Sequence, residues 1–239
     1  MKRASFVPIG LIAAFFLLFT SCGDSDCVKG EGEVERQELQ VDELEAITVE
    51  GPIDVVLYRS DSQQVEVEGQ PNLIGLMRTE VRDGVWAIRT SQCINTSKDL
   101  IVHLSLPQIT SISIEGSGEV TTEDQFDGGS MDLHIAGSGE IEMIVNANTV
   151  NTSITGSGDL AVMGMCQDLT ATINGSGNIK AGDLQATRAE AEVVGSGDLD
   201  LHVTDELKAT VTGSGDIRYK GSPPNVNKNV TGSGDIREK

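Results

Sequence analysis

The sequence contains very few aromatic residues. Phe, Trp and Tyr together make up 3% of its 239 residues, with one Trp and two Tyr. Sugar-binding grooves usually present Trp or Tyr platforms to their ligands, so this composition disfavours a groove of that kind. The single tryptophan, Trp86, alternates with Ile88 in a strand-like segment. This alternation predicts a core position for Trp86 rather than a binding platform.

Basic residues are also scarce. The chain has 17 Lys and Arg against 37 Asp and Glu, which gives a formal net charge of −20. Nucleic acid and anionic lipid headgroups repel so acidic a surface. We therefore expect no nucleic-acid partner, and we interpret the charge as a source of solubility outside the cytoplasm.

The most prominent feature of the chain is a Gly-Ser-Gly motif that recurs at a nearly constant period. An acidic residue or Asn follows each copy, then an aliphatic residue, and successive copies begin 21, 19, 19, 20, 18 and 19 residues apart. The copies begin at Gly116, Gly137, Gly156, Gly175, Gly195, Gly213 and Gly232. A fixed period of about 19 residues indicates one structural unit stacked on copies of itself.

Short alternating runs of aliphatic residues flank each motif. One column of them follows the motif (Val120, Ile141, Leu160, Ile179, Leu199, Ile217 and Ile236), and another precedes it (Ile114, Ile135, Ile154, Ile173, Val193, Val211 and Val230). Alternation places such residues on one strand face, and β-branched side chains suit a pleated sheet. The glycines exclude long helices, and the constant period disfavours an antiparallel sandwich. The sequence predicts an all-β fold, a single-stranded right-handed parallel β-helix (solenoid) with coils of about 19 residues.

The repeated glycines have a mechanical explanation. Glycine allows a positive φ at a sharp bend and has no side chain to collide with the same bend in the next coil. The functional alternative is a phosphate-binding loop. However, no P-loop Lys follows the glycines, and an acidic residue stands where phosphate would approach. We interpret the motif as a structural corner.

Residues 1–21 have the features of a lipoprotein signal peptide. Lys2 and Arg3 precede an apolar stretch at 11–19, which is too short to span a bilayer as a stable helix. A Thr-Ser pair stands directly before Cys22, which resembles the bacterial lipoproteins whose cysteine is acylated. We predict lipidation of Cys22 and a place in the bacterial cell envelope, in the outer membrane, facing either the periplasm or the surface. A plain secreted protein is the alternative.

The chain divides into three regions. Residues 1–21 form the signal peptide, and residues 22–35, rich in Gly, Asp and Glu, are predicted to form a lipid-anchored tether. Residues 36–239 are predicted to form one β-helix domain, with irregular coils at 36–115 and the Gly-Ser-Gly repeats at 116–239.

The last coil departs from the pattern. Pro223 and Pro224 replace strand residues, and Lys228 occupies an inward column that holds Leu, Thr or Ala in the other repeats. Proline and an inward-pointing charge both discourage pairing of an edge strand with another molecule.

Acidic residues follow nearly all of the motifs and are predicted to form one column. They are Glu119, Glu140, Asp159, Asp198, Asp216 and Asp235, with Asn178 among them. Such a column could collect calcium, but the known calcium-binding repeat has a different period, and we favour structural turns. His103, His134 and His202 fall in separate segments without neighbouring Cys. We therefore predict no metal site and no cofactor.

Three cysteines remain once Cys22 is assigned to lipid. Cys27 and Cys93 both lie in the irregular N-terminal part, and an exported chain meets an oxidising environment. We predict a disulfide between them. Cys166 lies within a repeat beside Met165 and is predicted to be a small buried hydrophobic residue.

Four segments precede the repeats in a recognisable order. They are Ile53–Leu57 (IDVVL), Val65–Gly69 (VEVEG), Asp83–Ile88 (DGVWAI) and Leu104–Pro107 (LSLP). Together with the lipoprotein signal and the repeats, they resemble the auto-transporter adhesin head GIN domain family over roughly residues 30 to 236. The resemblance implies a right-handed β-helix on secreted or lipid-anchored envelope proteins, with an adhesive role. It defines no catalytic residues, so none is assigned.

Two functional hypotheses follow. The first is a lipid-anchored envelope protein whose β-helix is a rigid, acidic adhesin or binding scaffold without catalysis. Its partners would be the membrane, through the N-terminal lipid, and an envelope or extracellular glycan or protein. The alternative is a polysaccharide-active enzyme that uses surface carboxylates on one face of the β-helix. Two stacked carboxylates with Lys or Arg in a deep groove would favour the enzyme, and a smooth surface would favour the scaffold.

Overall fold

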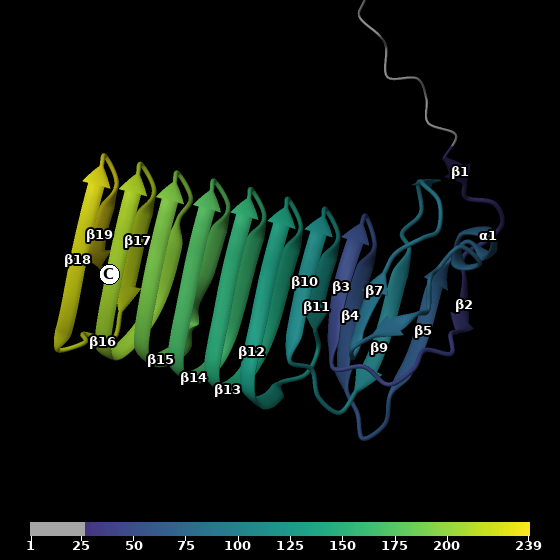
Figure 1. The fold of residues 1–239 in the computed structure, drawn as a ribbon, viewed down its shortest axis with the longest axis horizontal. Helices are drawn as coiled ribbons and strands as arrows, with labels where there is room; N and C mark the ends of the chain where they lie inside the picture. Colours follow the sequence, from purple (N-terminus) through teal and green to yellow (C-terminus); the bar gives the residue numbers. More distant parts are fainter. Residues whose placement is uncertain (1–26) are drawn as a thin grey trace, which may run out of the picture.

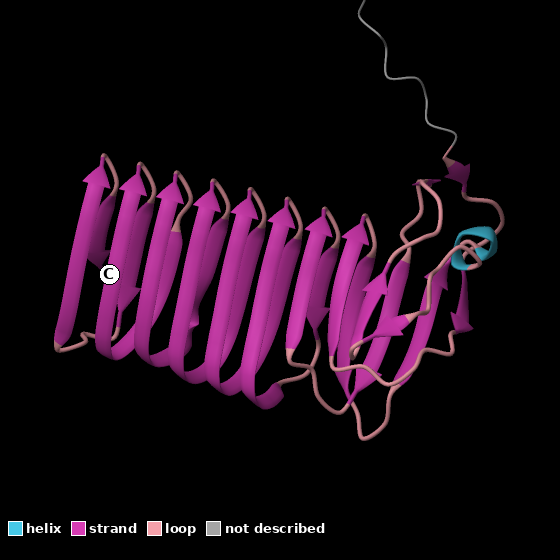
Figure 2. Ribbon diagram, viewed as in Figure 1, coloured by secondary structure: helices cyan, strands magenta, loops and turns pink. Residues whose placement is uncertain are grey.

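The computed structural model describes residues 27–239, which form nineteen strands and one short helix (Figures 1 and 2). The predicted signal peptide and Cys22 lie outside these residues. The N-terminal elements are β1 (Val28–Lys29), β2 (Glu35–Glu38), β3 (Ala46–Gly51), β4 (Asp54–Arg59), β5 (Gln64–Gly69), α1 (Pro71–Ile74), β6 (Val81–Arg82), β7 (Val85–Ile88), β8 (Ile94–Asn95) and β9 (Ile101–Leu106). The repeat elements are β10 (Ser111–Gly116), β11 (Glu119–Thr122), β12 (Phe126–Gly137), β13 (Glu140–Gly156), β14 (Asp159–Gly175), β15 (Asn178–Gly195), β16 (Leu199–Gly213), β17 (Asp216–Lys220), β18 (Asn225–Gly232) and β19 (Asp235–Glu238).

The repeats wind into a β-solenoid of about seven turns with coils of roughly 19 residues. Long strands from successive repeats lie side by side across the ribbon (Figure 1). All their pairings are parallel, with Ile135 beside Ile154 and Ile154 beside Ile173, and the register shifts only at bulges between β14 and β15 and between β15 and β16. The predicted solenoid and its period are confirmed, and its right-handed sense stays a prediction.

The Gly-Ser-Gly motifs form a row of corners along one edge of the solenoid. The first glycine of every motif has φ between 127° and 141°, a region that side chains rarely adopt. A Cβ on Gly137 would lie 2.3 Å from the Gly116 carbonyl oxygen, and one on Gly139 would lie 2.7 Å from that of Gly118. Glycine is therefore required by both the bend and the stacking, which supports the mechanical explanation.

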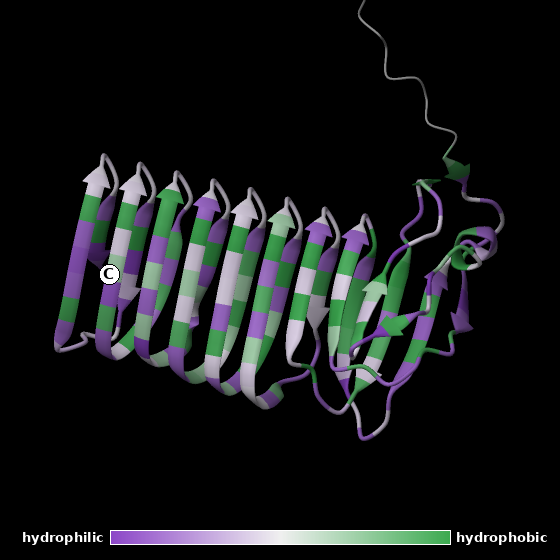
Figure 3. Ribbon diagram, in the orientation of Figure 1, coloured by the Kyte–Doolittle hydropathy of each residue, from purple (hydrophilic) through white to green (hydrophobic). Residues whose placement is uncertain are grey.

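The core includes the two aliphatic columns predicted from the sequence, apart from Val230 in the last coil, which is 42% exposed. Hydrophobic and hydrophilic bands alternate along the strands (Figure 3). Ile154 and Ile173 are fully buried, whereas the neighbouring Thr155 is exposed. Trp86 is also fully buried, and its indole N–H donates to the Arg78 carbonyl at 2.9 Å. Trp86 is thus a core residue, as predicted.

The N-terminal part differs from the simple series of coils predicted for residues 36–115. The coil of β3 and β4 lies between the coil of β10 and β11 and the coil of β7 and β9, so the order of coils in space is not their order in the chain. On the outer side of β9, the strand pairing becomes antiparallel. There β5 pairs with β9, and β2 pairs with β5. A hairpin of β6 and β7 is antiparallel too. We call residues 27–38, 64–82 and 90–99 the N-terminal cap.

The C-terminal coil is less enclosed than the others. Every residue of β18 is exposed. Lys228 stands in register with Ala209, in the inward column, as predicted. No helix in the described part of the chain is long and apolar enough to cross a membrane.

Candidate functional site

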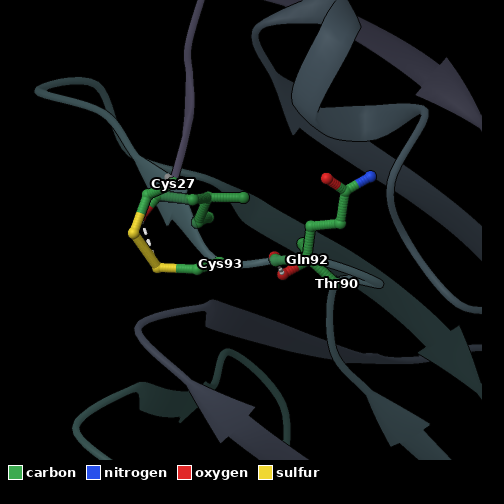
Figure 4. Close-up of a disulfide and its surroundings, with 5 residues drawn as sticks. Cys27, Thr90, Gln92 and Cys93 are labelled. Carbon is green, nitrogen blue, oxygen red and sulfur yellow. Dashed lines mark hydrogen bonds between the residues drawn. A yellow bond between two sulfur atoms is a disulfide. The ribbon is translucent and has the colours of Figure 1, made fainter. Parts of the chain in front are cut away.

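A disulfide between Cys27 and Cys93 closes the N-terminal cap (Figure 4). The sulfur atoms are 2.11 Å apart and the Cα atoms 4.6 Å apart, and the Val28 N–H donates to the Cys93 carbonyl at 2.8 Å. The predicted pair is confirmed. Cys166 is a buried free thiol. Burial, with the nearby charge of Asp168, raises the pKa of Cys166 to about 11, so the thiol stays protonated and unreactive at neutral pH.

Polar contacts fasten the segment that follows the disulfide. The side chain of Asn72, in α1, accepts a hydrogen bond from the Glu31 N–H at 2.9 Å and donates to the Lys29 carbonyl at 2.7 Å. The predicted tether at 22–35 is therefore too long, because residues 27–35 belong to the cap. The tether was predicted from its Gly, Asp and Glu content, and composition alone does not reveal which residues such a segment contacts.

The acidic corner residues form a ladder of hydrogen bonds between coils. In the C-terminal coils the backbone N–H of each corner residue donates to the side chain one coil earlier: Asp198 to Asn178 at 3.3 Å, Asp216 to Asp198 at 3.3 Å, and Asp235 to Asp216 at 3.1 Å. Asn178 in turn donates to Asp159 at 2.7 Å. These contacts support the structural interpretation of the column. Within residues 27–239, no group of three or more His, Cys, Asp or Glu side chains is placed to hold a metal ion.

Two arginines neutralise the C-terminal half of this column. Arg218 contacts Asp198 at 2.8 Å and Asp200 at 2.9 Å, and Arg237 contacts Asp216 and Asp235, both at 3.2 Å. Sequence reasoning treated the column as acids alone and missed these pairs. The signal was available, because an Asp-Ile-Arg triplet follows the last two Gly-Ser-Gly motifs.

The N-terminal half of the column has less compensation. The Glu119 N–H donates to the Asp54 carboxylate at 3.1 Å. Burial raises the pKa of Glu119, and the charges of Asp54, Glu140 and Glu142 raise it further. The pKa of Asp54 is also raised, mainly by burial and also by the charge of Asp99, against the hydrogen bond from Glu119. The solenoid therefore carries closely spaced negative charge where the first repeat meets the coil of β3 and β4.

The stacked acids do not have the setting that the enzyme alternative calls for. Asp198 lies in the corner before β16 and Asp200 at an outward position of β16, and their side chains are 42% and 26% exposed. Burial raises the pKa of Asp200, but hydrogen bonds from Arg218 and Lys239 lower it more, so the pKa of Asp200 lies below its ordinary value. A carboxyl with a lowered pKa is a poor general acid. These acids are paired with Arg on an exposed face, which favours a structural role.

The histidines do not come together. His103 lies 3.3 Å from the Glu68 carboxylate, and its ring stacks 6.3 Å from that of Tyr58 on the outer face of the N-terminal coils. His134 and His202 lie in β12 and β16, coils away from His103.

One groove of 720 Å³ lies at the edge of the N-terminal coils opposite the corners. Its lining includes Val41, Leu44 and Pro107 together with the carboxylates of Glu43, Glu45 and Asp61, and no basic residue. The Gln63 side chain shapes it by donating to the Val41 carbonyl at 3.1 Å and accepting from the Leu44 N–H at 3.1 Å. The carboxylates of this groove repel an anionic ligand.

The stacked coils and the disulfide-bonded cap define a capped β-solenoid. The family model described as "Putative auto-transporter adhesin, head GIN domain" matches residues 43–223, and the chain belongs to this family. The family resemblance drawn from the sequence is confirmed.

Solved structures share this fold. That of a putative adhesin from Bacteroides fragilis NCTC 9343 has a TM-score of 0.84 at 24% identity, covering 89% of this chain and 100% of that chain. A putative adhesin from Parabacteroides distasonis ATCC 8503 has a TM-score of 0.74 at 27% identity, covering 90% and 100%. A putative lipid binding protein from the same strain has a TM-score of 0.74 at 25% identity, covering 89% and 99%. No curated protein matches the chain by sequence.

Proposed function

We propose that the protein is a binding scaffold of the bacterial cell envelope, an adhesin anchored by a lipid on Cys22 and acting without catalysis. Membership of an adhesin family supports the binding role, as do a structural neighbour described as an adhesin and another described as lipid-binding. The regular solenoid supports a role in display rather than in chemistry, because its coils, within residues 27–239, lack the long loops that usually hold catalytic groups.

The observation that carries this proposal is the position of the disulfide. Cys27 is bonded to Cys93, and disulfides persist in oxidising compartments outside the cytoplasm. Only four residues separate Cys22 from Cys27. An extended chain covers at most ~3.6 Å per residue, so a lipid on Cys22 would hold the cap within roughly 18 Å of the bilayer. The repeats would then extend from a membrane-proximal cap.

The charge of the cap region supports anchoring by lipid rather than by surface attraction. The cap as defined above (residues 27–38, 64–82 and 90–99) contains eight acidic and five basic side chains. Anionic headgroups repel such a surface. Acyl chains contribute about 0.8 kcal/mol for each buried methylene group, which offsets this repulsion.

The test of anchoring is a Cys22→Ala variant in cell fractionation. We expect the unchanged protein to sediment with the membranes after a high-salt wash and the variant to appear in the soluble fraction. A Cys166→Ala variant is the matched control and should stay with the membranes. Sedimentation of Cys22→Ala after the wash would show that another feature holds the protein.

The binding role is tested separately, with the purified chain on glycan and protein arrays. A reproducible ligand supports the scaffold. Release of new reducing ends from any polysaccharide on incubation with the protein would instead establish the enzyme alternative. Neither result depends on the outcome of the fractionation experiment.

A further inference from the structure

The outer edge of the last coil is an unpaired strand. In the part of the chain that the structure describes, β18 pairs only with β16, and β19 pairs only with β17. Each inner coil, by contrast, has parallel partners on both sides. The backbone N–H and C=O groups on the outer side of β18 are therefore available to another extended chain.

The side chains of β18 also lack cover. Val226 and Val230 are 39% and 42% exposed, although their partners in register, Leu207 and Val211, are fully buried. Their exposure arises because no described coil lies beyond them. An added strand with aliphatic residues above these two positions would bury their apolar surface.

Lys228 lies between the two valines and determines which strand fits. Its ammonium group donates to the Ile236 carbonyl at 3.1 Å and lies 4.7 Å from the centre of the Tyr219 ring, at the end of the core. An aliphatic residue above Lys228 would bury the ammonium group without a counter-ion, which is strongly unfavourable. A carboxylate above it would form an ion pair, and so an acid is the residue that this position accepts.

The surrounding charge favours the same partner. Residues 216–239 carry five basic and three acidic side chains, whereas the whole chain has a net charge of −20. Four of these basic side chains, Arg218, Lys220, Arg237 and Lys239, already contact carboxylates, so Lys228 is the basic side chain of this coil left to attract an acidic segment. A second copy of the chain is disfavoured, because two-fold pairing of two β18 edges would bring two Lys228 ammonium groups into one buried layer.

We infer that the edge of β18 binds an extended segment of a partner protein by strand addition. The segment carries an aliphatic, an acidic and an aliphatic residue at alternate positions, facing Val226, Lys228 and Val230. The same lysine that discourages pairing with apolar edges and with identical copies thus selects an acid-bearing strand. This inference names the ligand class of the proposed binding scaffold and rests on that function, but it does not depend on the lipid anchor.

The experiment uses labelled peptides and the purified chain. The parent peptide copies residues 206–213, which already pair with β18 in register on its inner side. One peptide has Glu in place of Ala209, and the control has Lys there. Fluorescence anisotropy should show that the Glu peptide binds at least about tenfold more tightly than the Lys peptide. With a Lys228→Glu protein this preference should reverse, and with Lys228→Gln it should disappear.

Several outcomes would overturn the inference. Equal affinity of both peptides for the unchanged protein would mean that Lys228 does not select the strand. Absence of binding up to 1 mM peptide, which corresponds to a binding free energy weaker than roughly −4 kcal/mol, would mean that the edge of β18 does not accept an added strand. Sedimentation velocity that shows self-association, abolished by Lys228→Glu, would identify a second copy as the occupant. Circular dichroism melts of the three proteins verify that each variant is folded.

Discussion

The side-chain amide of Asn178 donates a 2.7 Å hydrogen bond to the carboxylate of Asp159, one coil earlier in the solenoid. Its carbonyl oxygen accepts the backbone N–H of Asp198, one coil later, at 3.3 Å. A neutral amide therefore interrupts a column of carboxylates and bonds to both of its neighbours. The column is stable because three means are combined along it: hydrogen bonds to backbone N–H groups, arginine partners and this single amide.

An Asn178→Asp substitution should destabilise the protein. It replaces the donor to Asp159 with a carboxylate and makes all seven residues of the column acidic, and we expect a loss of about 1–2 kcal/mol at pH 7. Thermal melts measure the effect. Asn174→Asp, at an exposed position just before the same corner, is the matched control and should change stability by less than ~0.5 kcal/mol. Equal shifts for the two variants would show that the amide has no special place in the column.

A Glu119→Gln substitution should stabilise the protein at neutral pH. The pKa of Glu119 is raised in the folded state by burial and by neighbouring carboxylates. The folded state thus holds the proton more tightly than the unfolded state. Ionised Glu119 therefore destabilises the folded protein above the folded pKa, and this destabilisation fades as the pH falls. We expect the melting temperature to rise by about 1–2 °C at pH 7.5, since the side chain is exposed to screening, with no gain near pH 4.

The Asp200→Asn substitution should lower the melting temperature at neutral pH. The pKa of Asp200 is lowered, because Arg218 and Lys239 outweigh the effect of burial. Its contribution to stability is present above the unfolded pKa and is lost as the pH falls through the folded pKa. The variant should therefore melt at a lower temperature at pH 7.5 and at the same temperature as the unchanged protein in strong acid. Shifts of the same sign for this variant and Glu119→Gln would contradict both assignments.

An aspartate at Ile154 should unfold or nearly unfold the solenoid. Ile154 is fully buried between Ile135 and Ile173, so the charge would have no partner, and we expect a cost of several kcal/mol, roughly 3–5. Thr155→Asp, one residue further on the exposed face, should cost under ~1 kcal/mol. Chemical denaturation of both variants measures the difference.

Loss of the disulfide should loosen the cap and leave the repeats intact. The bridge joins residues separated by 66 positions, and the chain-entropy model assigns such a link on the order of 4 kcal/mol. In a Cys27→Ser, Cys93→Ser double variant, hydrogen exchange should rise in β1, β8 and the residues between β1 and β2. Exchange in β12 to β16 should not change. Uniformly faster exchange along the whole chain would contradict this local role.

Much of the repeat region was predictable because each contact in it is between neighbouring periods. Once Ile135 and Ile154 occupy the same place in two repeats, stacking fixes their pairing, and the inward face follows. The disulfide was predictable because few cysteines remained to choose from. The order of the N-terminal coils was not, because strands such as β5 and β9 are recognisable one by one while their partners and direction depend on distant segments. The roles of Arg218 and Arg237 were missed because the acidic column was considered alone, without the arginines that lie two residues after Asp216 and Asp235.

The out-of-order coils have a consequence for how the solenoid assembles. Ile112 pairs with Ile47, 65 residues earlier in the chain, whereas Leu133 pairs with Ile112 only 21 residues earlier and later coils keep similarly short steps. The longest loop closure in the stack is thus needed once, where β10 pairs with β3, and each later coil adds by a local step. Whole repeats can therefore be gained or lost among the later coils without disturbing the cap. Each one changes the length of the solenoid by about 4.8 Å.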